Sequence, residues 1–203
     1  MDRLDQVIQT AGPLLRRVDE TISTVGAPPG HHLWAELRRV RLLPGDAVHA
    51  VAALRPAELA EAAPVLRADA RAYAGIADSL PTPTDWTGDA ADAYDAARRR
   101  AADHLSGSPD SLDERLEATA DLADALIEWI AQARSELAAI LAEILSSTEA
   151  LDLSTASIVD SSAALSAADI AVRLLRTVAD SYDLATDLLN GSAELPNVQY
   201  QRA

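Results

Sequence analysis

Residues 81–94 of this chain read Pro81-Thr82-Pro83-Thr84-Asp85-Trp86-Thr87-Gly88-Asp89-Ala90-Ala91-Asp92-Ala93-Tyr94, and they separate two long amphipathic segments. The prolines end the first segment, because proline cannot continue a helix. Glycine permits the backbone conformations that a tight reversal needs. Trp86 supplies a large apolar side chain that we expect to close the open end of a helical hairpin. The stretch therefore predicts a chain reversal at Trp86-Thr87-Gly88.

The segments on both sides of this turn repeat apolar residues at helical spacing. The first helix is expected over residues 57–80, with Pro64 bending or dividing it. Its apolar face consists of Leu59, Ala63, Leu66, Ala70, Tyr73, Ala77 and Leu80. The return helix is expected over residues 89–105. Its inward face is predicted to consist of Ala90, Ala93, Tyr94, Ala97, Ala101 and Leu105.

The N-terminal quarter also has helical character. Residues 2–25 predict a helix that Gly12-Pro13 kinks or splits. Its continuous face consists of Leu4, Ile8, Ala11, Leu15, Val18, Ile22 and Val25. A loop at 26–30 leads to a short amphipathic turn or helix within 31–42, and Asp46 is placed to cap a further short helix near 47–54. A leftover apolar strip on these helices is a candidate for partner docking.

Beyond the hairpin, Ser106-Gly107-Ser108-Pro109 interrupts the pattern, and Ser108 is a candidate N-cap for a long helix that reaches about residue 150. The seam of that helix follows a heptad pattern through Leu126, Ile130, Ala133, Leu137, Ile140 and Ile144. A turn is expected in the Ser- and Thr-rich stretch 152–162, and a last helix from near Ser161 to Leu189. Asn190-Gly191 is expected to end it. The predicted face of this helix consists of Leu165, Ala168, Val172, Leu175, Ala179, Tyr182 and Leu189.

These patterns predict an all-α protein, an elongated helical bundle built on a Trp-x-Gly helical hairpin with about five to seven helices. We expect a single helical domain over residues 1–190. It would comprise an N-terminal helical extension (1–55), the hairpin with the long helix (56–150) and a C-terminal helix (158–190). Residues 191–203 are expected to form a flexible tail.

Composition narrows the function. The 203 residues carry a net charge of -15, which argues against binding nucleic acid or an anionic membrane surface. The chain has no Cys, and all 17 basic residues are Arg, so cysteine nucleophiles, zinc-thiolate sites and lysine Schiff bases are excluded. No stretch is long and apolar enough to span a membrane, and the start of the chain lacks the features of a cleaved signal peptide.

No residue pattern predicts catalysis, a metal or a cofactor. Adjacent His31 and His32 point apart and have no third ligand at suitable spacing, so a polar loop is the favoured interpretation. The acids near the turn, from Asp85 to Asp95, lack the alternation of a calcium loop and are explained by the helix dipole. Arg98-Arg99-Arg100 spread around a helix, so at most two of them share a face. We therefore expect a protein that is not an enzyme.

Residues 56–150 resemble the WXG family of type VII (ESX) secretion substrates, with Trp86, Gly88 and the small residues after them matching the family's turn and second helix. The family consists of helical hairpins that pair into four-helix bundles and are exported folded, without a cleaved signal peptide. This chain is about twice the size of a minimal member. The family's export signal is Tyr, three residues, then Asp or Glu. Tyr182 with Asp187 is only an imperfect candidate, because Asp187 comes one place late.

The resemblance implies a non-enzymatic, type VII-secreted or secretion-associated interaction protein that acts by pairing helix faces. Its expected partners are a second copy of itself, or a second helical protein of the same type, and the secretion machinery. The expected location is outside the cell by a route independent of a signal peptide, or the cytoplasm before export. The alternative is a cytosolic helical chaperone, adaptor or neutralising partner of a type VII substrate or toxin. A small hydrolase with an acidic site is a third interpretation that no specific residue favours.

Overall fold

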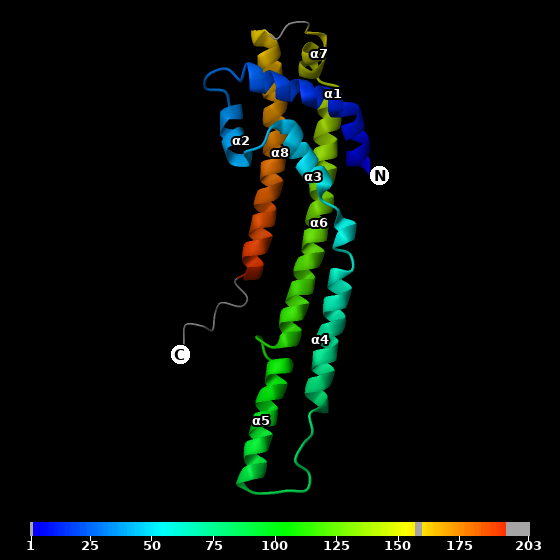
Figure 1. Cartoon of the computed structure of the whole chain (residues 1–203), viewed down its shortest axis with the longest axis vertical. Helices are drawn as coiled ribbons and strands as arrows, with labels where there is room; N and C mark the ends of the chain where they lie inside the picture. Colours follow the sequence, from blue (N-terminus) through cyan, green and yellow to red (C-terminus); the bar gives the residue numbers. More distant parts are fainter. Residues whose placement is uncertain (1, 157–159, 194–203) are drawn as a thin grey trace. The chain divides into compact units, whose positions relative to one another are not determined.

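The structure, a computed structural model, describes residues 2–156 and 160–193, and these form α-helices with no strand among them (Figure 1). The elements are α1 (Arg3–Thr24), α2 (Leu33–Val40), α3 (Pro44–Ala53), a 3-10 helix η1 (Pro56–Glu58), α4 (Ala62–Ser79), α5 (Asp89–Leu105), α6 (Leu112–Leu145), α7 (Thr148–Thr155) and α8 (Ser161–Ala193). The all-α prediction is confirmed for these residues. The beginning of the expected C-terminal segment (158–159) and residues 194–203 of the expected tail lie outside the described residues.

The chain divides into two compact units, where the sequence predicts a single domain. Unit 1 comprises residues 1–56 and 128–186, and unit 2 comprises residues 57–127 and 187–203. Residues 1–55, expected as an extension, thus belong to the same unit as the C-terminal half of α6, α7 and most of α8.

The core of unit 1 is built from α1, α2, α3, α6, α7 and α8. The predicted face of α1 is largely confirmed, since only Val25 at its end is more than half exposed. The predicted seam of α6 is also confirmed, with Ile130, Leu137 and Ile144 buried. On α8 the seam is partly wrong: Leu165, Tyr182 and Leu189 are exposed. Small residues such as Ala163, Ala167 and Ala171 are buried instead, which allows close approach of neighbouring helices.

Several prolines and glycines do not interrupt or end the helices at the places that the sequence predicts. Pro13 lies inside a continuous α1 and does not split it. Pro64 lies in the first turn of α4, where its missing N–H needs no helical partner, and η1 forms a separate element before it. Gly191 lies within α8 without a left-handed conformation, so Asn190-Gly191 does not end that helix, and residues 191–193 are helical rather than part of a tail.

Two predicted helix starts and one predicted helix end are also corrected. Asp46 does not cap α3; Leu43 is the N-cap residue, and the Gly45 N–H donates instead to Asp19 Oδ1 of α1 over 3.0 Å. Ser108 does not cap α6, which begins after Ser111, a fully buried residue whose hydroxyl donates to the Ser108 carbonyl over 2.6 Å.

The long helix expected to reach residue 150 ends at Leu145. Ser147 then caps α7 by accepting from the Ala150 N–H over 3.2 Å.

Candidate functional site at the Trp86–Gly88 turn

The turn predicted from Trp86-Thr87-Gly88 lies in unit 2, in the loop of residues 80–88 between α4 and α5. The two helices pack against each other and run antiparallel (Figure 1). Gly88 is the N-cap residue of α5, with φ of 101° and ψ of -177°. Only glycine adopts this region readily, so Gly88 has the conformational role that the sequence predicts. The Gly88 carbonyl accepts the first helical hydrogen bond from the Asp92 N–H over 3.1 Å.

Trp86 does not close the end of the hairpin as expected, because 46% of its surface is exposed. Its ring packs on Tyr94 of α5, with centroids 5.5 Å apart and a tilt of 52°. The Tyr94 hydroxyl donates to the Pro81 carbonyl over 2.9 Å and so fixes the start of the loop to α5. Trp86 thus packs on α5 from within a loop of nine residues. Thr87 is also exposed.

The face of α4 in this hairpin is as predicted. Ala63, Ala70 and Ala77 are buried, and the larger residues of the predicted stripe are partly buried between them. Small residues at this spacing allow the two helix axes to approach closely. The sequence therefore identifies correctly which side of α4 faces the rest of unit 2.

The predicted buried face of α5 differs from the observed one by about one residue position, or about 100° of helix rotation. The side with the lowest exposure carries Ala91, Asp95, Arg98, Ala102 and Leu105. Asp95 and Arg98 fit there because they form an ion pair over 2.9 Å with side chains only 23% and 19% exposed. The prediction selected the side with the most apolar residues. All of that side except Leu105 is exposed, and we call it the outer face of α5: Ala90, Ala93, Tyr94, Ala97 and Ala101.

The charged residues of α5 are acidic in the first turn, where the helix dipole favours them, and the three Arg residues of its second half have different surroundings. Asp89 and Asp92 lie in the first turn, where the partial positive charge of the helix stabilises them. Arg98 and Arg99 both bind Asp95, whereas Arg100 forms no ion pair within the part of the chain that the structure describes. As predicted, the three consecutive Arg residues do not form one patch.

The remaining predicted positions lie elsewhere. His31 Nε2 lies 3.1 Å from Asp169 Oδ1, and its Nδ1 accepts over 3.1 Å from the N–H of Leu33, the first residue of α2. In residues 2–156 and 160–193, no group of three His, Cys, Asp or Glu side chains could hold a metal ion. Tyr182 packs edge-on against Trp129 at 5.6 Å, and burial raises the pKa of its hydroxyl. Asp187, the second part of the imperfect export signal, is exposed further along α8.

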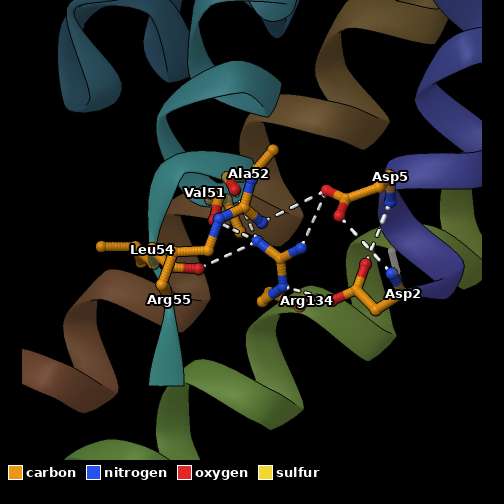
Figure 2. A network of polar contacts seen from close by, with 7 residues as sticks. All are labelled: Asp2, Asp5, Val51, Ala52, Leu54, Arg55 and Arg134. Carbon is orange, nitrogen blue, oxygen red and sulfur yellow. Dashed lines mark hydrogen bonds and ion pairs between the residues drawn. The ribbon is translucent and has the colours of Figure 1, made fainter. Parts of the chain in front are cut away.

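One polar cluster of unit 1 was not predicted. Arg134 on α6 is only 4% exposed, and Figure 2 shows its guanidinium between Asp2 and Asp5 on one side and the C-terminal end of α3 on the other. It donates to Asp2 Oδ2 over 2.6 Å, to Asp5 Oδ1 over 3.0 Å and to the Ala52 and Leu54 carbonyls over 2.6 and 2.9 Å. The sequence did contain an indication that Arg134 is buried, because it directly follows Ala133 of the apolar seam of α6. All partners of this cation come from the chain itself, so the cluster is a structural junction.

Comparison with protein-family models, with curated proteins and with solved structures finds no match to this chain. Among the described helices, none combines the length and apolar character that crossing a bilayer requires. The hairpin of α4 and α5, with Trp86 and Gly88 in its turn, is therefore the feature of the chain that bears on function.

Proposed function

We propose that this chain is a non-enzymatic helical interaction protein, secreted by or associated with a type VII (ESX) system, that acts by pairing helix faces. The observation that carries the proposal is the outer face of α5, an apolar helix face next to Trp86 that no part of the described chain covers. Its neighbour Gly88 supplies the backbone conformation that a Trp-x-Gly turn requires.

The pairing mechanism follows from the chemistry of this face. Ala residues spaced by three and four positions let a second helix approach closely, and such a contact removes apolar surface from water. Trp86 and Tyr94, 46% and 37% exposed, lie at the turn end of the same helix. Exposed aromatic rings of this kind contribute strongly to protein interfaces. The partner is a second copy of the chain or another helical protein with a Trp-x-Gly turn.

The experiment that tests this proposal compares culture filtrate with cells for the tagged wild type, Trp86→Ala and Leu151→Ala in a host that exports type VII cargo. Leu151 is a matched control, because it is a large apolar residue of unit 1 that is 62% exposed. We expect the wild type and Leu151→Ala in the filtrate and Trp86→Ala retained in cells at equal total expression. Circular dichroism of the purified variants checks that all three remain folded.

Retention of the wild type in cells that export their other type VII cargo would contradict export. It would favour the alternative, a cytosolic chaperone, adaptor or neutralising partner. Equal export of wild type and Trp86→Ala would contradict a role for the turn, although not export itself.

A further inference from the structure

The outer face of α5 has a charged edge that bears on the identity of its partner. Asp89 and Arg100 are eleven positions apart, so at about 100° per residue they lie on nearly the same side of the helix, about 16 Å apart along its axis. Both are exposed, and neither forms an ion pair within the described part of the chain. Asp92 is rotated by only about 60° from Asp89, but in the direction away from the Ala residues of the outer face.

These two charges are self-complementary. If two copies of α5 pair antiparallel through their outer faces, Asp89 of one helix faces Arg100 of the other, and the reverse contact forms by symmetry. The midpoint of this arrangement falls between Tyr94 and Asp95. A parallel two-fold pair would place these edges on opposite sides of the contact, so Asp89 of one copy could not meet Arg100 of the other.

The distribution of charge favours α5 over the rest of the surface as the place where two copies meet. The chain carries a net charge of -15, which makes contact between two copies unfavourable over most of the molecule. Helix α5 is an exception, since it carries four Asp and three Arg. Ala residues on both sides of a symmetric contact also match each other in size, so both helices can approach closely.

We propose that the outer face of α5 binds the same face of a second copy in an antiparallel pair, with two symmetric Asp89–Arg100 contacts at its edge. This inference rests on the proposed function, because it names the partner of the same face. One helix of 17 residues per copy forms a contact smaller than the about 1,600 Å² of a standard protein interface. The dimer is therefore weak and depends on concentration.

The test is sedimentation velocity of the full chain over a range of concentrations at low and high salt. The variants are Asp89→Arg, Arg100→Asp and their equimolar mixture. Each variant alone would face like charges at both edge contacts, so we expect its dissociation constant to rise by about tenfold or more. In the mixture, the chain with two Arg residues meets the chain with two Asp residues, and dimer formation is expected to return. Asp92→Arg is the matched control, because it makes the same charge change in the same turn away from the face.

A wild type that stays monomeric up to its solubility limit would overturn the inference, as would a dimer that neither reversal weakens. The failure of the proposed function has a separate readout. An exported chain that is monomeric contradicts only the second-copy partner, and a dimer that remains in cells contradicts only export.

Discussion

The guanidinium of Arg134 on α6 donates to the carboxylate of Asp2, the N-cap residue of α1, over 2.6 Å. The side chain of Asp2 meanwhile accepts from the Asp5 N–H over 3.0 Å, so the residue that begins α1 is also an anchor for α6. The opposite edge of the guanidinium satisfies carbonyls at the end of α3. One buried cation thus holds two helix ends within unit 1.

The first prediction is that Arg134→Met destabilises unit 1 by about 2–4 kcal/mol, because it leaves buried carbonyls and two carboxylates without their cation. Urea unfolding measures the change in the free energy of unfolding. Hydrogen exchange of the α3 and α8 amides then shows whether the loss of stability lies in unit 1. Arg173→Met is the control in the same unit: Arg173 is 39% exposed and pairs with Glu143 over 3.0 Å, so its loss is expected to change stability by less than about 1 kcal/mol. Equal effects of the two variants would show that the junction has no special role.

The second prediction concerns acid. The hydrogen bond from Arg134 lowers the pKa of Asp2 from its ordinary value of 3.8 to about 2. An acid with a pKa lower in the folded state stabilises that state above its unfolded pKa, and this contribution is lost as the pH falls through the folded pKa. We therefore expect the free energy of unfolding to decrease between about pH 4 and pH 2. Asp2→Asn retains a capping side chain but cannot titrate, so its decrease should be smaller. Identical pH profiles would contradict the assignment.

Features that depend on local periodicity could be predicted from the sequence, whereas those that depend on contacts between distant residues could not. The buried sides of α1 and α4 follow from periodicity alone, because each helix buries one apolar stripe. The buried side of α5 could not be predicted, because Asp95 and Arg98 can be placed there only as an ion pair and the exposed side is richer in Ala. Contacts between distant segments, such as Asp19 capping α3 and Arg134 joining α1 to α3, carry no local pattern that identifies the partner.

The same limit applies to the candidate site. The backbone role of Gly88 was predictable from residue type, because only glycine has ready access to positive φ of this kind. The exposure of Trp86 was not, because it depends on the length and course of the loop between α4 and α5.

The third prediction separates backbone strain from packing in the hairpin. A Cβ at Gly88 would meet no atom within 4 Å, so Gly88→Ala costs stability only through its φ of +101°, by about 1–3 kcal/mol. Gly75 of α4 also has open space around it, but its backbone is helical. Gly75→Ala should therefore stabilise the same hairpin by about 0.5–1 kcal/mol. Thermal unfolding of both variants measures the difference, and shifts of the same sign would contradict the turn geometry.

A ladder of charged pairs joins α2 to α8 within unit 1. Glu36 lies 3.3 Å from Arg176, and Arg39 lies 2.9 Å from Asp180 and 2.5 Å from Asp183. The α8 partners, with Asp169 beside His31, follow one side of that helix. By contrast, Leu33 is the only apolar residue of α2 that is fully buried. Leu37 and Val40 are partly buried against the core, so the charge pairs add to apolar packing in holding this short helix.

The fourth prediction is that Arg39→Gln and added salt both loosen α2 selectively. Arg39 is 38% exposed, so its pairs with Asp180 and Asp183 are partly screened by solvent, and their loss is expected to speed amide exchange in residues 33–40 by up to about tenfold. Arg38→Gln is the matched control, because Arg38 is exposed on the same helix and forms no ion pair within the described residues. Helix α3 is the internal reference, since Val48 and Val51 bury it in the core and its exchange should not depend on salt. Hydrogen exchange measured by mass spectrometry at low and high salt tests this directly. If Arg38→Gln loosens α2 as much as Arg39→Gln, apolar packing rather than the ladder holds the helix.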